Sequence, residues 1–225
     1  MEPWIVDTAH QVRSPNTHRQ HGNTMLPVEL VVLHYTAGSS ARSSAEWFRD
    51  ERNKSSSAHF VIDRDGTLLQ CVALDDRAWH GGGKSSAWAG RSVNQRSIGI
   101  EIANWGLLDG TPETGLLTPY GRPYTGPAER VDLKVPATGP LRDRLAAAKR
   151  PTSGTVSTWW EPFTPSQLDA VRDLLRRLGE AFPVLRTAGP GGANRVISHE
   201  ECDPTRKLDT GPLFPLALAR SWVLP

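Results

Sequence analysis

Two short strand-like segments, each ending in a histidine, constrain the fold of this chain more than any other feature of its sequence. The first, residues 30–33, follows Pro27 and leads into His34. The second, residues 195–199, ends in His199. Short runs rich in apolar β-branched residues are typical of buried strands. Parallel neighbouring strands end at the same edge of a sheet, so this pattern predicts an α/β protein in which the two imidazoles can meet.

A third segment, residues 97–103, alternates between apolar and small or polar side chains. Alternation with a period of two puts its three isoleucines on one face of a strand, and Gly99, Glu101 and Ala103 on the other. Glu101 then has small neighbours and free space beside its carboxylate, which suits a cleft. A surface carboxylate on an edge strand is the alternative interpretation.

The remaining regular elements are predicted from turn and capping signals. Residues 59–63 and 67–72 flank an Asp-Gly pair, which predicts a β-hairpin. Residues 43–46 and 164–167 have the pattern of capping boxes, in which a hydroxyl and a residue three positions later satisfy free backbone donors. Each capping box predicts the start of a helix, and leucine and valine recur at helical spacing after the second one.

The organisation of the chain follows from its length and from the distribution of proline and glycine. A length of 225 residues allows one large domain or a domain with an insertion. Between positions 106 and 162 lie eight of the 18 prolines and seven of the 20 glycines, with a helix-like stretch only around 141–149. We therefore expect an irregular arm (1–27), after which the core begins, a main domain (28–217) with a long Pro/Gly-rich insertion (about 107–162), and a tail (218–225). The insertion leaves Glu101 directly, so we expect it to border the cleft.

Composition excludes several classes of protein. The net charge of +2 is too small to mark a nucleic-acid or anionic-membrane binder. No apolar run approaches the roughly 20 residues that span a bilayer. Cys71 and Cys202 allow one disulfide at most, so the fold does not depend on a disulfide framework. Partners are therefore to be predicted from sites, and no protein partner is deducible.

The two strand-end histidines suggest a metal site. A catalytic zinc site needs three protein ligands and one open position. His34 and His199 would supply two, and the third would come from the polar loop after His199, whose candidates are Glu200, Glu201, Cys202, Asp203 and Asp209. Spacing alone leaves open the alternative that both histidines are hydrogen-bonded structural residues.

Six segments in a fixed order form a pattern that is more specific than the spacing of the two histidines. They are His34-Tyr35-Thr36, Ser57-Ala58-His59-Phe60, Ala78-Trp79-His80-Gly81-Gly82, Ser86-Ala87-Trp88-Ala89-Gly90, Ser97 to Asn104, and His199 through Arg206-Lys207-Leu208-Asp209 to Pro215. Together they resemble the zinc-dependent N-acetylmuramoyl-L-alanine amidases of the type-2 family, which includes phage lysozyme-type amidases and peptidoglycan recognition proteins. The anhydromuropeptide amidases of bacteria are the most similar branch, and the resemblance covers roughly residues 28–105 and 160–217.

The resemblance implies a central mixed sheet flanked by helices and one Zn²⁺ per chain, held by His34, His199 and Asp209. Cys202 remains a rival third ligand, because thiolate binds zinc well and some family members use cysteine. Glu101 would take a proton from the attacking water and deliver it to the leaving amine. Lys207 would stabilise the oxyanion.

The implied reaction is cleavage of the amide between N-acetylmuramic acid, or its 1,6-anhydro form, and L-alanine in peptidoglycan or muropeptides. His59, His80, Asn104 and Arg206 are candidate substrate contacts. A non-catalytic peptidoglycan-binding module and a zinc peptidase acting on the stem peptide are the alternatives. The first residues lack the basic start and apolar stretch of a signal peptide, so we expect cytoplasmic synthesis with action on the cell wall or on imported muropeptides.

Overall fold

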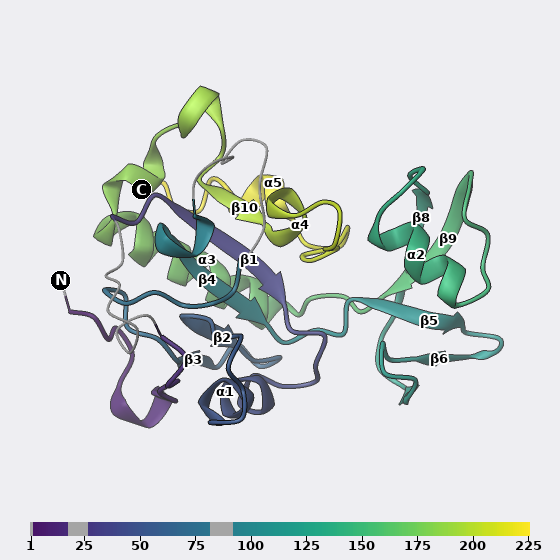
Figure 1. Cartoon of the computed structure of the whole chain (residues 1–225), viewed down its shortest axis with the longest axis horizontal. Coiled ribbons are helices and arrows are strands. Elements are labelled where there is room, and N and C mark those ends of the chain that lie inside the picture. The colour runs from purple at the N-terminus through teal and green to yellow at the C-terminus, as the bar shows by residue number, and fades with distance from the viewer. Residues whose placement is uncertain (1, 18–26, 82–91) are drawn as a thin grey trace.

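A five-stranded mixed sheet forms the centre of the molecule (Figure 1). The computed structural model describes residues 2–17, 27–81 and 92–225, and the motif at 86–90 lies outside these ranges. The strand order is β10-β1-β4-β2-β3, and all neighbours are parallel except the pair of β2 and β3. The strands are β1 (Leu30–Tyr35), β2 (Phe60–Ile62), β3 (Leu68–Gln70), β4 (Ser97–Ile102) and β10 (Val196–Ser198). The predicted mixed sheet and the hairpin of β2 and β3 are confirmed.

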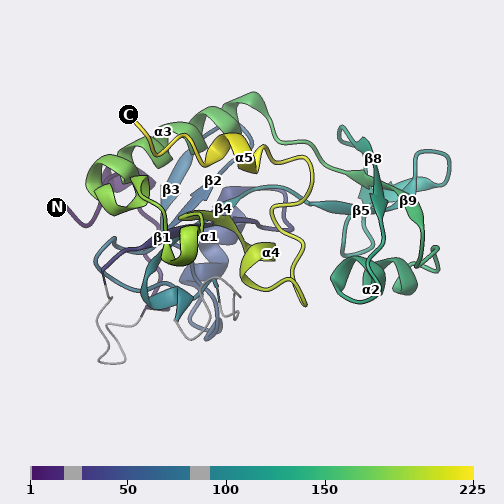
Figure 2. The same cartoon turned by 90° about the horizontal axis from the view of Figure 1, so that it is seen from above.

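Helices cover both faces of this sheet (Figure 2). The three isoleucines of β4 pack with the apolar stripe of α3 (Pro165–Ala181) in the largest buried cluster. Alternation along β2 sends Val61 to the opposite face, where it packs against α1 (Ala41–Arg49). The sheet therefore buries apolar side chains on both of its faces, against the apolar side of α3 on one face and of α1 on the other.

The segment predicted to be a long Pro/Gly-rich insertion folds into a second five-stranded sheet beside the main one (Figure 1). Its order is β7-β6-β5-β9-β8, and every pair is antiparallel. The elements are β5 (Leu107–Thr111), β6 (Gly115–Leu117), β7 (Pro123–Tyr124), β8 (Glu129–Lys134), α2 (Pro140–Ala147) and β9 (Thr155–Trp160). The helix near 141–149 is confirmed, and the five strands around it are elements that the sequence analysis does not predict. Prolines and glycines here delimit short strands, and a small core that includes Leu145 and Trp160 holds them to α2.

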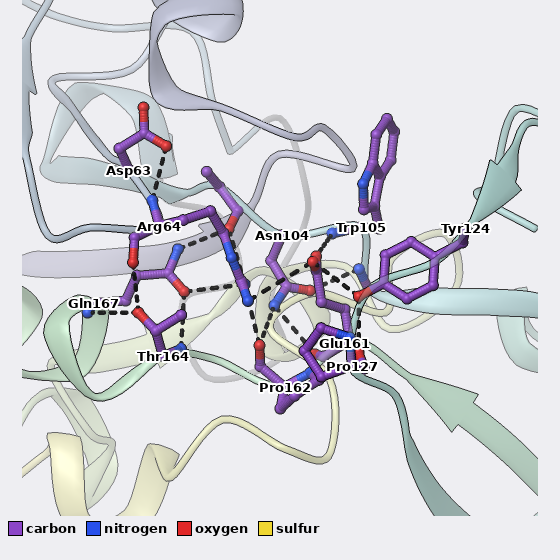
Figure 3. Close-up of polar contacts among 12 residues, drawn as sticks. Asp63, Arg64, Asn104, Trp105, Tyr124, Pro127, Glu161, Pro162, Thr164 and Gln167 are labelled. Atoms are coloured by element: carbon purple, nitrogen blue, oxygen red, sulfur yellow. Dashed lines mark hydrogen bonds and ion pairs between the residues drawn. The ribbon is translucent and has the colours of Figure 1, made fainter.

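A buried polar network joins this insertion to the main domain where its two ends meet (Figure 3). Asn104 donates from Nδ2 to the carbonyl of Glu161 (3.1 Å) and accepts at Oδ1 from the amide of Gly106 (2.7 Å). The Glu161 carboxylate accepts from the amide of Trp105 (2.6 Å) and lies 3.7 Å from the guanidinium of Arg64. Because these residues flank both ends of the insertion, the network fixes its direction relative to the main sheet.

Local details correct some of the expected boundaries. Ser40, rather than Ser43, caps α1 and accepts from the amide of Ser43 (3.2 Å), so this helix begins earlier than the sequence pattern predicted. The capping box of Thr164 is present as predicted. His199 does not end a strand. It is the first residue of α4 (His199–Cys202), which Ser198 caps.

The two chain ends contribute to the core. Val12, in the predicted arm, packs against α1, and Val223, in the predicted tail, joins the main cluster beneath α3. The expectation that the core begins only after residue 27 is therefore wrong. The other short elements are η1 (Thr8–His10), η3 (Val93–Gln95), η4 (Pro183–Arg186), η5 (Pro190–Gly192) and α5 (Leu216–Ala219). In the described parts of the chain, no helix has the length and apolar character needed to cross a bilayer.

The contact between α3 and the C-terminal segment gives a stability prediction. A Cβ added at Gly179 would lie 2.2 Å from the carbonyl oxygen of Val223, which is backbone. We expect Gly179→Ala to lower the free energy of unfolding by about 1–3 kcal/mol through overpacking, although alanine favours a helix by about 1 kcal/mol. Denaturant unfolding measures this. The exposed Asp173→Ala on the same helix is the control, with an expected change within about 0.5 kcal/mol, and stabilisation by Gly179→Ala would contradict the prediction.

Candidate metal centre and active site

The sheet topology brings the predicted residues to one edge. Within the parallel pair of β1 and β4, His34 is in register with Glu101. On the other side of β1, the parallel strand β10 ends at Ser198, and His199 follows at once. Parallel strands end in the same direction. The imidazoles of His34 and His199 and the carboxylate of Glu101 therefore lie at the same edge of the sheet, at the ends of three adjacent strands. The loop after α4 adds Asp209 to this edge.

Three side-chain atoms converge at this edge. His34 Nδ1 lies 2.9 Å from His199 Nδ1 and 3.1 Å from Asp209 Oδ2, and His199 Nδ1 lies 3.0 Å from Asp209 Oδ2. All three residues are buried. Among the described residues, these three form a cluster whose ligand atoms suit a shared metal ion.

The spacing of these atoms fits a tetrahedral zinc site. Zinc ligands at about 2.0–2.1 Å from the metal lie roughly 3.3 Å from one another, close to the distances seen here. A single proton on His199 Nδ1 can form a hydrogen bond to only one of the other two atoms, whereas a central cation can bind all three atoms. Burial, followed by the neighbouring His199, lowers the pKa of His34 to about 4, so its imidazole is neutral at pH 7, the form that binds metal.

The other candidate third ligands point elsewhere. Cys202 is buried in an apolar cluster with β1 residues, and burial raises the pKa of its thiol to about 12. Asp203 accepts from Arg206 Nε at 2.6 Å, and Glu201 caps α4 by accepting from the amide of Ser198. Burial alone would raise the pKa of Asp209, but its contacts with the two imidazoles outweigh this and hold the pKa well below its usual range. A charged Asp209 is what a cation site requires.

Glu101 lies beside the cluster with a carboxylate that is poorly stabilised as an anion. Its strand, β4, runs between β1 and β2, so the alternative of an edge strand is wrong. Among the described residues, no hydrogen-bond partner contacts its buried Oε2 atom. Burial raises the pKa of Glu101 to about 8, and Asp209 adds to the shift while Lys207 opposes it. A carboxyl group with a pKa near neutrality can both accept and release a proton.

His80 contacts His34 and fixes its proton. Ser97 donates its hydroxyl to the carbonyl of Val93 (2.7 Å), so it accepts from His80 Nε2 (3.1 Å). His80 Nδ1 is then an acceptor, and it lies 3.0 Å from His34 Nε2. His34 must therefore carry its proton on Nε2 and present the lone pair of Nδ1 to the cluster. The substrate contact expected for His80 stays a prediction, since His80 lines the cavity, and this positioning contact is one that the sequence analysis does not predict.

Gly99 explains how the His80 ring reaches this position. A Cβ at Gly99 would lie 2.4 Å from the ring, so only glycine leaves room for it. Gly99 and Glu101 face the same side of β4, as the alternation predicted. The small residue beside the carboxylate thus accommodates an imidazole.

Two of the predicted substrate contacts lie away from the cavity. His59 is fully buried: Nδ1 accepts from the amide of Gly99 (3.0 Å), Nε2 contacts the carbonyl of Asp76 (3.1 Å), and burial lowers its pKa to about 4. Asn104 is fully buried in the network at the base of the insertion. Both polar ends of each side chain are occupied, so the structure does not bring these residues to a substrate.

A cavity of about 460 Å³ opens over the cluster. Glu101, Lys207, His80 and Arg206 line it together with the three clustered residues. The insertion contributes Tyr120, Pro140 and Arg144, as expected for a segment that borders the cleft. No sequence pattern marks these three residues individually, because only the fold of the insertion carries them to the cavity.

Comparison with known proteins identifies the family to which this chain belongs. The sequence model of the N-acetylmuramoyl-L-alanine amidases matches residues 24–212. The chain belongs to this family. The resemblance seen in the sequence motifs is thereby confirmed.

The individual relatives share less than a third of their residues with this chain over the aligned regions. The chain is 24% identical to N-acetylmuramoyl-L-alanine amidase AmiD of Escherichia coli (strain K12), over 89% of this chain and 55% of AmiD. It is 28% identical to 1,6-anhydro-N-acetylmuramyl-L-alanine amidase AmpD of Citrobacter freundii, over 75% of this chain and 58% of that protein. The chain thus spans little more than half the length of these two relatives. The crystal structure of a selenomethionine derivative of AmpD has the same fold, with a TM-score of 0.59 and 21% identity over 99% of this chain and 97% of the other.

The raised pKa of Glu101 predicts a pH-dependent stability in the presence of a chelator. The carboxyl binds its proton more tightly when folded, so stability falls as pH rises from 4.5, its usual pKa, to about 8. We expect Glu101→Gln to melt at a higher temperature than the wild type at pH 8, with no difference near pH 4. Thermal unfolding at both pH values measures this. Glu180→Gln, which alters an exposed carboxyl on α3, should change neither value, and a lower melting temperature for Glu101→Gln at pH 8 would contradict the prediction.

Proposed function

We propose that this chain is a zinc-dependent amidase that cleaves the bond between N-acetylmuramic acid, or its 1,6-anhydro form, and L-alanine in peptidoglycan or muropeptides. The observation that carries the proposal is the convergence of His34 Nδ1, His199 Nδ1 and Asp209 Oδ2 within about 3 Å of one another, with Glu101 in the same cavity. Membership of the amidase family and the names of the relatives AmiD and AmpD support the choice of bond.

His34, His199 and Asp209 would hold one Zn²⁺ ion. When bound, the ion supplies Lewis-acid polarisation of the scissile carbonyl and a lower pKa for the attacking water. The donor set suits it, because two neutral imidazoles and one carboxylate leave a fourth position free. His80 keeps His34 in the tautomer that presents Nδ1, through the chain of contacts from Ser97.

Glu101 moves the proton of the reaction. Its carboxylate accepts a proton from the attacking water, whose oxygen forms a bond to the carbonyl carbon of the lactyl group. The same proton then passes to the alanine nitrogen as the C–N bond breaks, which leaves a carboxyl group on the muramic acid and a free amine on the peptide. Lys207 lines the same cavity and would place its ammonium near the oxygen that becomes negative.

The three clustered residues predict a clear difference between two variants. Asp209→Ala removes one of the atoms at the cluster and should lose stoichiometric zinc and peptide release from muropeptides. Cys202→Ala alters a buried thiol outside the cluster and should retain both, which makes it the matched control. Elemental analysis after dialysis measures the zinc, and a chelator should abolish wild-type activity. Loss of zinc in Cys202→Ala, with retention in Asp209→Ala, would show that the thiol is the ligand.

The role of Glu101 predicts a variant that binds metal but does not turn over. Glu101→Gln keeps the shape of the side chain but cannot accept a proton, so we expect kcat to fall by about 100-fold or more with zinc content unchanged. Mass spectrometry of the products identifies the bond that is cut. Release of the whole stem peptide, with a free amine on its N-terminal L-alanine, supports the amidase, and cleavage inside the peptide would identify a peptidase. Binding without any product would identify a recognition module.

A further inference from the structure

Two exposed aromatic side chains border one hollow next to the metal cluster. Among the described residues, the large apolar side chains that are exposed include two aromatic ones, Trp47 (51%) on α1 and Tyr120 (70%) on the insertion. They lie far apart in the sequence, yet both line the same hollow of about 440 Å³. Exposed aromatic groups gathered at one place on a surface are typical of a binding site.

The lining of this hollow is rich in hydroxyl groups. Besides Trp47, Tyr120 and the buried Phe48, it includes Thr36, Ser43, Ser44 and Ser56. Glu101 is the charged residue of the lining, and because it also lines the cavity over the cluster, the hollow and the cavity adjoin. A ligand bound here would therefore reach the candidate catalytic carboxylate while contacting mainly rings and hydroxyls.

The cavity over the cluster has a basic lining that the hollow lacks. Arg144, Arg206 and Lys207 line the cavity but are not among the residues that line the hollow. Asp109 holds Arg144 at 3.0 Å. A stem peptide carries carboxylates, which pair with guanidinium and ammonium groups. An uncharged sugar ring has apolar C–H faces and a rim of hydroxyls, which match aromatic faces and serine or threonine side chains.

Tyr120 is held in place before any ligand binds. It lies in a turn between β6 and β7 that is closed by the amide of Gly121 donating to the carbonyl of Thr118 (2.9 Å). The Trp105 ring contacts the Tyr120 ring edge to face, with centroids 6.2 Å apart. The amide of Trp105 is in turn held by Glu161 in the network of Figure 3. Such preorganisation reduces the entropy cost of binding.

We infer that Trp47 and Tyr120 form a carbohydrate subsite for the sugar residue linked to the muramic acid, with the stem peptide on the side of Arg144. This inference rests on the proposed function and specifies its substrate class. An additional sugar subsite has a consequence for substrate choice. Glycan strands and disaccharide muropeptides become better substrates than muropeptides with a single sugar.

The test compares two substrates that carry the same stem peptide, N-acetylmuramoyl-peptide and N-acetylglucosaminyl-N-acetylmuramoyl-peptide. For the wild type we expect a higher kcat/KM with two sugars. Trp47→Ala and Tyr120→Ala should each reduce this preference by about 3- to 10-fold, mainly through KM, because each removes one aromatic contact. Leu218→Ala, at an exposed apolar residue on α5, is the matched control and should leave the preference unchanged. Tyr120→Phe keeps the ring and should retain most of it.

A second measurement separates this inference from the proposed function. Titration calorimetry with tetra-N-acetylchitotetraose, which has sugars but no peptide, reports on the subsite without any reaction. If the wild type cleaves both substrates and the aromatic variants change neither the preference nor this binding, the subsite is wrong and the amidase stands. If no substrate is cleaved but the aromatic variants weaken binding of the tetramer relative to Leu218→Ala, the subsite stands and the proposed reaction is wrong.

Discussion

The close approach of His34 Nδ1, His199 Nδ1 and Asp209 Oδ2 is the constraint on which the rest of this structure depends. Three atoms that each offer a lone pair repel one another unless something positive lies between them. The parallel pairing of β10 with β1 places His199, which follows β10, beside His34. The amide of Glu200 donates to the carbonyl of Asp209 (2.7 Å), which holds the third residue next to them. The fold therefore brings three acceptor atoms together at the edge of its sheet. A divalent cation, as in the proposed zinc site, would attract all three atoms at once.

Much of this edge could be predicted from the sequence because its signals are local. A strand-like run that ends in His34, and an alternation that puts Glu101 beside glycine, each need only a few residues to be recognised. The order of the motifs then selects Asp209 from several loop candidates. The roles of His59 and Asn104 could not be predicted in this way, since a polar residue within a motif can face a cavity or the interior. Burial is a property of the whole fold, and both residues satisfy buried backbone groups.

The second sheet was missed for a related reason. Its strands are short, and β8 is exposed along most of its length, so little apolar alternation marks it. The many prolines and glycines indicated a long insertion with one helix, although here they mark turns between strands. In β9, however, Val156, Thr158 and Trp160 are buried in alternation with more exposed residues. That strand carried a period-two signal, which the surrounding composition obscured.

The way the insertion is attached explains how it can shape the cleft without disturbing the cluster of His34, His199 and Asp209. Its base is a satisfied network of buried polar groups around Glu161, in which burial raises the pKa of that carboxyl while the amide of Trp105 and the guanidinium of Arg64 oppose the shift. Directional hydrogen bonds specify one orientation more sharply than apolar contact does. From this base the insertion carries Arg144 and Tyr120 to the lining of the cavity, and Tyr120 also borders the adjoining hollow. The position of both groups is therefore set by residues 104–106 and 161–162, outside β1, which bears His34, and α4, which bears His199. Changes in the insertion can alter the shape and charge of the cleft while the three ligand atoms keep the spacing that the main sheet imposes.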